Sequence, residues 1–435
     1  MPFLCGASRK IITPPLGTPL FGYRPDVFST TVHDDLTATA VAFGNDEKTA
    51  LLISLAVGEL SNEVFVSLRK KVAEASGVNE RDIIIHATHT HSAPNVCGME
   101  GWGEVNHEYI DEILSPMTIV AAKEAVDSMK PAELGVEEIK SEIGINRRQQ
   151  DRHGNILLGQ NPWGCYDPYL TFISVRNTED RSGIINLIHY GCHGTACGCS
   201  TEITRDWSGV MIDRVEKQTG IMTAFLNGAI GDVGPRLSNG QTVGDITFVR
   251  ELGSYAAMDA MRVFKKIRSY SSPKIKIYND TIRLPYNKMP ELAEVEKKLQ
   301  SYSEPEKLVN LHRLTYMHLK EIAEYLKSDP KEAVPEFFAF EENILKVGDI
   351  LFIPYPYEFF SEISMRLRAY TGVRHTLALS CSNGCNAYLP VESALCRGGY
   401  ETAVFQNSGL FTLTDNADQH LINETLRIIE EGDNK

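Results

Sequence analysis

The feature that most constrains the fold is a strongly apolar segment that runs directly into a group of histidines. Residues 83–87 read Ile-Ile-Ile-His-Ala, and residues 88–94 continue as Thr-His-Thr-His-Ser-Ala-Pro. The apolar part predicts a strand that is buried on both faces. Because side chains alternate between the faces of an extended backbone, we expect His89 and His91 to point the same way. Two imidazoles that share a face at the end of a buried strand favour a metal or acid/base site over a simple polar cap.

The composition limits the kind of partner that this protein can have. Of its 435 residues, 43% are hydrophobic and 23% are charged, which is typical of a soluble globular protein. Its net charge of −14 argues against binding to nucleic acid or to an anionic membrane, since both need a basic surface. We find neither an apolar run of roughly 20 residues, as a transmembrane helix requires, nor a signal peptide. We therefore expect a cytoplasmic protein that acts on a small or neutral molecule, and the oligomeric state stays open.

A strand, a helix and a second strand are predicted to lead up to the histidines. The apolar segment 49–57 comes first, and a helix follows that begins after Ser61 and ends at Gly77. Because such a connection favours two parallel strands, ligands are expected to gather beyond their carboxyl ends. His89 and His91 lie at this position.

The rest of the chain alternates between predicted strands and predicted helices. Segments 170–175 and 184–189 flank a polar turn and predict a hairpin. Residues 289–332 are charged, with leucines at helical spacing, and predict a helical hairpin inserted into the fold. We expect an α/β protein with a mixed, largely parallel sheet flanked by helices, and a single domain over residues 1–435.

Further polar side chains follow other predicted strands. Besides His89 and His91, they are His193, Glu358 and Tyr388. Two histidines and a carboxylate with one open position form a zinc arrangement that suits hydrolysis. Taken alone, however, Glu358 fits the start of a helix and Tyr388 fits an ordinary loop position. Spacing alone does not select either residue.

Other motifs give weaker signals. Cys192, Cys197 and Cys199 surround His193, but they lack the paired spacing of a thiolate zinc site, so buried or idle thiols are the better interpretation. Glycines at 228, 231 and 234 lack the Lys-Ser/Thr of a phosphate-binding loop. A Gly-x-Ser-x-Gly motif is absent from the sequence, which removes the usual serine hydrolase interpretation.

Seven short motifs occur along the chain in the order in which one enzyme family has them. They are Ile12-Thr13-Pro14 with Gly22-Tyr23, His89-Thr90-His91-Ser92, Asn146-Arg147, His193-Gly194-Thr195, Gly231-Asp232-Val233 with Pro235, Pro356-Tyr357-Glu358-Phe359, and Ala387-Tyr388 with Tyr400-Glu401. Together they resemble the catalytic domain of the neutral/alkaline ceramidases, which are zinc-dependent amide hydrolases. The histidine motif at 89–92 is the most specific of the seven.

The resemblance implies a Zn²⁺ ion and a set of residues around it. The implied zinc ligands are His89, His193, Glu358 and Tyr388. His91, Arg147 and Tyr400 are implied to line the site. In this scheme His91 shuttles a proton, while Arg147 or Tyr400 stabilises the oxyanion.

Two departures from the family bear on the substrate. Gly228 stands where the resemblance places a serine of the family, and the chain stops soon after the catalytic core. We therefore expect an amide substrate that is smaller or more polar than ceramide, with a zinc-activated water as the nucleophile. The alternatives are a non-catalytic metal-binding or ligand-binding protein, and a zinc esterase or deacylase of a small metabolite.

Overall fold

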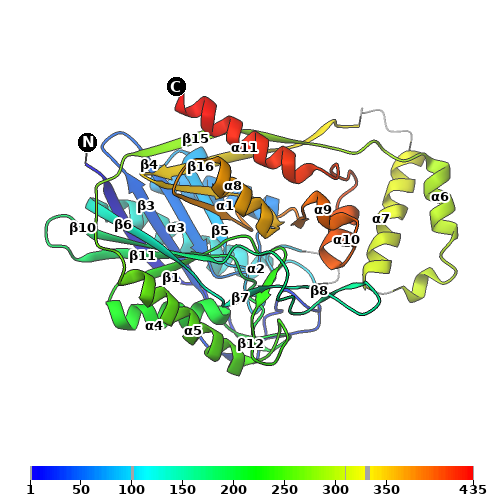
Figure 1. The fold of residues 1–435 in the computed structure, drawn as a ribbon, viewed down its shortest axis with the longest axis horizontal. Coiled ribbons are helices and arrows are strands. Elements are labelled where there is room, and N and C mark those ends of the chain that lie inside the picture. The colour runs from blue at the N-terminus through cyan, green and yellow to red at the C-terminus, as the bar shows by residue number, and fades with distance from the viewer. Residues whose placement is uncertain (1, 99–101, 309, 329–333, 435) are drawn as a thin grey trace.

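Two large β-sheets stacked face to face form the centre of the fold, with helices on both outer faces (Figure 1). This computed structural model describes residues 2–98, 102–308, 310–328 and 334–434. Side chains from both sheets form one buried cluster, in which the rings of Phe43 and Phe352 stack with their centroids 6.2 Å apart. The architecture is therefore a four-layer arrangement of helices, sheet, sheet and helices.

The larger sheet has eight strands. In chain order they are β1 (Leu4–Ile11), β3 (Thr37–Gly44), β4 (Thr49–Leu55), β5 (Ile83–Ala87), β6 (Lys130–Lys140), β10 (Tyr169–Asn177), β11 (Gly183–Tyr190) and β13 (Thr223–Asn227). Their order across the sheet is β13-β11-β10-β6-β1-β3-β4-β5. The predicted parallel pair β4/β5 and the predicted hairpin β10/β11 are both confirmed.

The prediction of an α/β fold with a mixed sheet is confirmed, but most strand pairs are antiparallel rather than parallel. In the larger sheet, β4/β5 and β11/β13 are parallel, and the other neighbours are antiparallel. The physical reason is the length of the connections. Short turns join β3 to β4 and β10 to β11, and a short turn allows only antiparallel pairing. Helical crossovers produce the two parallel pairs.

The smaller sheet has four strands. They are β15 (Ile275–Pro285), β16 (Phe337–Val347), β17 (Ile350–Pro354) and β19 (His375–Leu379), in this order across the sheet. Its outer face packs against α8 (Ser361–Tyr370) and α11 (Ala417–Asp433). The β17/β19 pair is parallel, so both strands end at the same edge.

Two pairs of helices cover the outer face of the larger sheet. The first pair is α1 (Asn62–Ser76) and α3 (Ser115–Asp127), and the second is α4 (Asp206–Thr219) and α5 (Ile246–Phe264). The predicted bounds of α1 are confirmed, because the Ser61 side chain accepts a hydrogen bond from the backbone N–H of Val64 and Gly77 ends the helix at φ 72°. A short α2 (His107–Tyr109) and a π-helical turn η2 (Ile110–Leu114) lead into α3.

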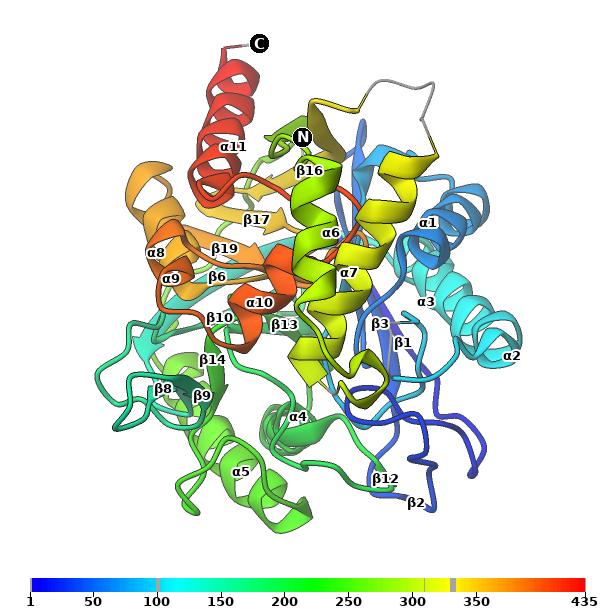
Figure 2. The same ribbon diagram turned by 90° about the vertical axis from the view of Figure 1, so that its right-hand side faces the viewer.

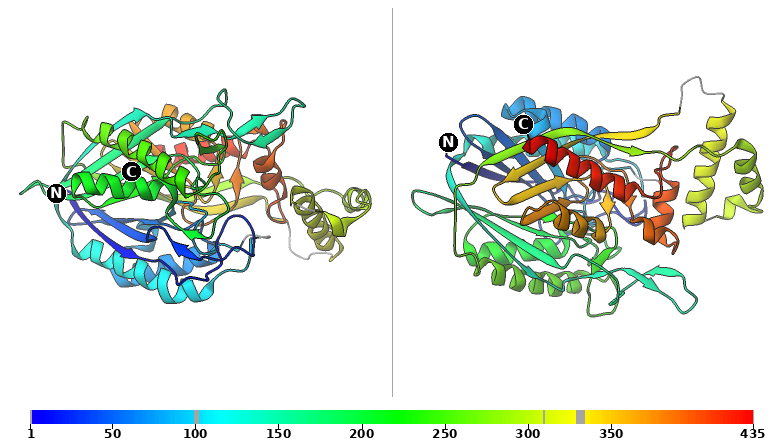
Figure 3. Two further views of the ribbon diagram at one scale, coloured as in Figure 1. Left: turned by 90° about the horizontal axis from the view of Figure 1, so that it is seen from below. Right: turned by 45° about the horizontal axis from the view of Figure 1, so that its top comes forward.

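A helical hairpin projects from the body of the molecule (Figures 1 and 3). It consists of α6 (Leu292–Gln300), a 3-10 turn η3 (Pro305–Lys307) and α7 (Asn310–Lys327). This is the helical insertion predicted for 289–332, although residues 309 and 329–332 lie outside the described part. Figure 2 shows the hairpin beside α10 (Tyr400–Asn407), which α7 contacts. Within the described residues, no helix is both long and apolar enough to cross a membrane.

The remaining elements are short. They are β2 (Thr31–Val32), β7 (Gly144–Asn146), β8 (Arg148–Gln150), β9 (Ile156–Leu158), β12 (Glu202–Ile203), β14 (Val233–Pro235), β18 (Glu358–Phe359), β20 (Tyr388–Leu389), η1 (Glu80–Asp82) and α9 (Glu392–Leu395). Except for η1, they lie in or beside the loops that carry the predicted site residues.

The larger sheet curls until its two edge strands, β5 and β13, approach each other. Ser54 on β4 donates a hydrogen bond to the carbonyl of Phe225 on β13, at 2.7 Å. Asn227, at the end of β13, donates to the carbonyl of Thr88 at 2.8 Å and accepts from the backbone N–H of Cys192 at 3.1 Å. This curl brings together the ends of β5, β11 and β13, where both histidine segments begin.

Candidate metal centre

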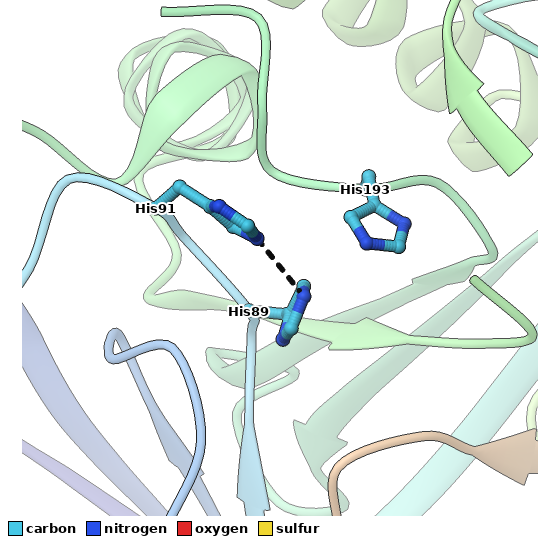
Figure 4. A group of neighbouring side chains, drawn as sticks. All are labelled: His89, His91 and His193. Carbon is cyan, nitrogen blue, oxygen red and sulfur yellow. Dashed lines mark hydrogen bonds between the residues drawn. The ribbon is translucent and has the colours of Figure 1, made fainter. Parts of the chain in front are cut away.

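Three histidines converge where these strands end (Figure 4). His89 and His91 follow β5, and His193 follows β11. All three are buried, and the Nε2 atoms of His89 and His91 lie 3.1 Å apart. One nitrogen from each ring falls within 4.8 Å of the other two. The structure thus places the two predicted histidine motifs in one small volume.

The backbone route to this arrangement differs from the predicted one. β5 ends at Ala87, and His89 has a left-handed backbone with φ 63°, so alternation along a strand does not explain why His89 and His91 meet. A left-handed conformation of a residue other than glycine costs roughly 1–3 kcal/mol and is common at functional sites. The next residue, Thr90, forms a bridge with Gly194, where a Cβ atom would lie 2.5 Å from the carbonyl oxygen of His89. Glycine at 194 therefore allows the two histidine segments to touch.

The hydrogen bonds of the rings fix which nitrogen of each histidine faces the centre. The Nδ1 atoms of His89, His91 and His193 lie 3.1, 3.2 and 2.8 Å from the carbonyl oxygens of Gly58, Gly22 and Ile230. Because a carbonyl oxygen can only accept, each Nδ1 carries a proton and donates it. Each Nε2 therefore presents a lone pair to the shared volume, as metal-binding histidines do.

A buried carboxylate faces the same volume. One oxygen of Glu358 lies 2.9 Å from Nε2 of His193 and 3.5 Å from Nε2 of His89. The side chain is fully buried, and neither oxygen has a hydrogen-bond partner. A carboxylate that meets nitrogen lone pairs inside a protein is unfavourable unless a cation lies between them. The histidine nitrogens and the carboxylate oxygen of Glu358 together form a donor set that fits a zinc ion.

Burial also holds the histidines in the form that binds metals. It lowers the pKa of His89, His91 and His193 well below the usual range, and the Arg147 guanidinium adds to this effect for His91 and His193. The rings are therefore neutral at pH 7. No proton has to leave Nε2 before a metal binds.

Arg147 links the histidines to the remaining predicted residues. Its guanidinium lies 2.9 Å from Nε2 of His193 and donates hydrogen bonds to the hydroxyl of Tyr388, at 3.0 Å, and to Glu401, at 2.8 Å. The ring of Tyr400 packs edge-on against that of Tyr388, with centroids 5.6 Å apart. β18 and β20 pair in parallel and set Glu358 opposite Tyr388. All seven residues that the resemblance implies thus belong to one connected group.

Gly228 does not belong to this group. A Cβ atom at this position would lie 2.8 Å from Nε2 of His189, a histidine outside the cluster, so a serine has no room there. The geometry thus gives Gly228 no part in the site.

Sequence reasoning gave no role to two acidic residues near the centre: it named Glu401 only as part of a motif, and it missed Glu59. Glu401 accepts hydrogen bonds from both Arg147 and Arg148, and Glu59 lies 3.9 Å from Nδ1 of His89. Glu59 follows β4, so the rule that ligands gather beyond parallel strands could have found it. The cysteines near His193 do not join the histidine cluster: Cys192 and Cys197 are buried thiols and Cys199 is exposed.

A cavity of about 370 Å³ opens beside Tyr388. Its lining is mainly aromatic and apolar, and consists of Cys97, Gly98, Tyr286, Phe338, Tyr357, Cys385, Asn386, Ala387, Tyr388, Phe405, Ser408, Gly409, Phe411 and Leu413. Tyr388 thus belongs both to this lining and to the group around Arg147. The cavity is a place where a substrate could lie next to the centre.

Comparison by sequence finds no relative of this chain: no family model matches, and no curated protein matches. Comparison by structure, in contrast, finds proteins with a similar fold. Neutral ceramidase from Pseudomonas aeruginosa superposes with a TM-score of 0.75 at 14% identity, over 99% of this chain and 75% of that protein. A structure described as ceramidase complexed with C2 gives 0.74 at 13% identity, over 98% and 74%. The chain therefore has the neutral ceramidase fold.

Proposed function

We propose that this protein is a zinc-dependent hydrolase that cleaves an amide bond. The observation that carries the proposal is the buried carboxylate of Glu358, which faces the lone pairs of His89 and His193 without a hydrogen-bond partner. The fold supports a hydrolase of the ceramidase kind, and the sequence motifs resemble the same family. The alternative of a non-catalytic binding protein is less well supported, because none of the implied ligands is missing.

In this proposal, His89, His193, Glu358 and Tyr388 hold the ion. When bound, zinc supplies a Lewis acid for the amide carbonyl and activates a water molecule for attack. The four residues come from separate segments of the chain. Hydrogen bonds from the histidines to backbone carbonyls orient two of them before any metal arrives.

His91 is the proposed proton carrier. Its Nε2 is unprotonated and lies 3.1 Å from Nε2 of His89, so it faces the volume that the proposed ligands share. It would accept a proton from the attacking water and donate it to the leaving amine, while its Nδ1 keeps the hydrogen bond to Gly22. No second buried base is required.

Arg147 is the proposed stabiliser of the oxyanion. Glu401 holds its guanidinium from one side, and the hydroxyl of Tyr388 accepts from another of its nitrogens. A fixed cation beside the reacting carbonyl stabilises the negative charge that develops in the transition state. Tyr400, which packs on Tyr388, helps to keep this arrangement rigid.

The cavity beside Tyr388 favours a substrate with one compact apolar group. Its volume of about 370 Å³ lies at the small end of the range for ligand sites, which is roughly 300–1,000 Å³. The aromatic lining suits an acyl chain or a ring, and the net charge of −14 does not favour docking on an anionic membrane. We therefore propose a small-molecule or lipid-like amide that is smaller or more polar than long-chain ceramide.

The test compares kcat/KM on short N-acyl amides in water with kcat/KM on long-chain ceramide in detergent. We expect the short amides to be preferred by a factor of about ten, or about 1.4 kcal/mol. His193→Ala should abolish turnover, while His153→Ala, at an exposed position, should not. A clear preference for long-chain ceramide would overturn the substrate assignment. Cleavage of esters alone would replace the amidase assignment by an esterase.

A further inference from the structure

A second group of side chains, of the types that bind metals elsewhere, lies near Nδ1 of His89, on the side of the ring away from the centre. Glu59 forms its middle, and the thiols of Cys385, Cys381 and Cys97 lie 2.8, 3.4 and 3.8 Å from the Glu59 carboxylate oxygens. We call these four residues the thiol cluster. We propose that the thiol cluster is a second metal site, which takes a thiophilic divalent cation such as Zn²⁺ or Cd²⁺ on Cys97, Cys385 and Glu59.

The surroundings of Glu59 favour a bound cation. Its side chain is 1% exposed, and the hydrogen bonds that it accepts come from thiols, which are weak donors. A carboxylate buried in this way is poorly satisfied by the protein itself. A cation on the same side as the sulfur atoms would satisfy it.

The three proposed ligands are also close enough together to bind one ion. One oxygen of Glu59 and the sulfur atoms of Cys97 and Cys385 all lie within 4.8 Å of one another. Two sulfur ligands on one zinc ion stand at most about 4.6 Å apart, because each bond is about 2.3 Å long. The ligands can therefore close on one ion with small movements of the side chains. Two thiolates and a carboxylate also form a soft donor set that differs from the histidine centre.

The two proposed thiol ligands are accessible from solvent. Cys97 and Cys385 both line the cavity of about 370 Å³, so an ion can reach them from solvent without unfolding the protein. Binding is a simple exchange. The cation takes the place of the two thiol protons, which are released to solvent, and no oxidant or reductant is needed.

A cation on the thiol cluster would connect two loops that carry residues of the histidine centre. Cys97 lies six residues after His91, and Cys385 lies three residues before Tyr388. Cys381 is buried, with its sulfur 3.4 Å from Nδ1 of His89, so the thiol cluster also contacts a proposed ligand from behind. A cation on the thiol cluster would position Tyr388 and limit the movement of His89. This inference does not depend on which bond the enzyme cleaves.

The test is a titration of the reduced, full-length protein with Cd²⁺, followed by the ultraviolet charge-transfer band of thiolate bound to cadmium. We expect a saturable band in the wild type that is lost in both Cys97→Ser and Cys385→Ser. Glu59→Gln should keep the band and weaken the affinity at least about tenfold. Cys396→Ser, which removes an exposed thiol, is the matched control and should titrate like the wild type.

A second comparison separates this site from the histidine centre. His193→Ala should keep the cadmium band, because it removes no ligand of the thiol cluster. An unchanged band in Cys97→Ser and Cys385→Ser, or no band in the wild type, would overturn the proposal. Circular dichroism of each variant shows whether it is folded. If one of these two variants does not fold, the other still decides, because Cys97 and Cys385 are both only half-buried.

Discussion

At the scale of single residues, the direction of one hydrogen bond decides what each buried histidine can do. His89, His91 and His193 all give their Nδ1 proton to a backbone carbonyl, and their Nε2 lone pairs meet. His189 is equally buried, but its Nε2 faces the carbonyl of Ala378, so it presents nothing to the centre. Residue type and burial alone would not separate these histidines.

The role of Arg147 can be tested with a conservative change. Arg147→Lys keeps the charge but loses the fork that joins Tyr388 and Glu401. We expect kcat to fall by about 10²-fold, as when one oxyanion donor is removed, while the zinc content stays the same. Steady-state kinetics and elemental analysis measure the two quantities.

Arg148→Lys is the matched control for this prediction. Arg148 is also buried and also pairs with Glu401, but its other hydrogen bond goes to the carbonyl of Gly398, away from the centre. We expect a much smaller change in kcat. An equal loss in both variants would assign the effect to the position of Glu401 rather than to direct contact by Arg147.

The sequence predicts part of this site on physical grounds. Histidines after buried strands indicate the location of His89, His91 and His193, because ligands gather at such ends. Glu358 and Tyr388 follow only from the resemblance to a family, since a glutamate before a helix and a tyrosine in a loop are common. The left-handed backbone of His89 is not readable from the sequence, because long-range contacts with Gly194 enforce it.

At the scale of elements, the site depends on the curl of the larger sheet, and Asn227 fixes that curl. Its side chain joins the end of β5, through the carbonyl of Thr88, to the loop after β11, through the backbone N–H of Cys192.

Helix α1 and the β10/β11 hairpin were predictable from the sequence, because their signals are local. The order of strands across the sheet and its curl were not, since they depend on partners far apart in the chain.

Replacing Asn227 should therefore weaken both the fold and the metal centre. Asn227→Ala leaves the Thr88 carbonyl and the Cys192 N–H without partners in the interior, which costs about 2–4 kcal/mol of unfolding free energy. Urea denaturation measures this loss, and a zinc titration should show weaker binding.

Asn186→Ala is the control for this prediction. Asn186 is also fully buried, but its side-chain amide makes longer contacts, of 3.3 and 3.5 Å. Equal losses in the two variants would contradict the special role of Asn227.

At the scale of the whole molecule, the two sheets are joined by buried polar contacts as well as by the apolar core. His86 on β5 accepts from the backbone N–H of Asn227, at 2.8 Å, and its Nδ1 lies 3.0 Å from the carbonyl of Ser380, just after β19. It thus links the two edges of the larger sheet to the smaller one. These contacts require a neutral ring, because Nε2 must accept a hydrogen bond.

This requirement predicts how stability depends on pH. Burial lowers the pKa of His86 to about 3, whereas the unfolded chain has a histidine pKa of about 6.5. At a pH between these two values, His86 is therefore protonated in the unfolded chain but not in the folded chain. The contribution of His86 is fully present above about pH 6.5 and is lost as the pH falls towards 3, at up to about 1.4 kcal/mol per pH unit.

Urea unfolding of the wild type and of His86→Gln at about pH 7 and about pH 5 measures this effect. We expect the difference in unfolding free energy between the two proteins to shrink as the pH is lowered, because other titrating groups cancel in the comparison. A difference that stays constant with pH would show that His86 does not titrate as its burial requires.

The central claim is that the histidines and Glu358 hold a zinc ion, and anomalous X-ray scattering at the zinc edge tests it most directly. Crystals of the zinc-loaded protein should show a strong peak about 2.0–2.1 Å from Nε2 of both His89 and His193, and about 2.0–2.2 Å from an oxygen of Glu358. In His193→Ala the peak should vanish, whatever happens at the thiol cluster. The result that would contradict the account is an active, zinc-loaded enzyme with no anomalous peak among these three residues.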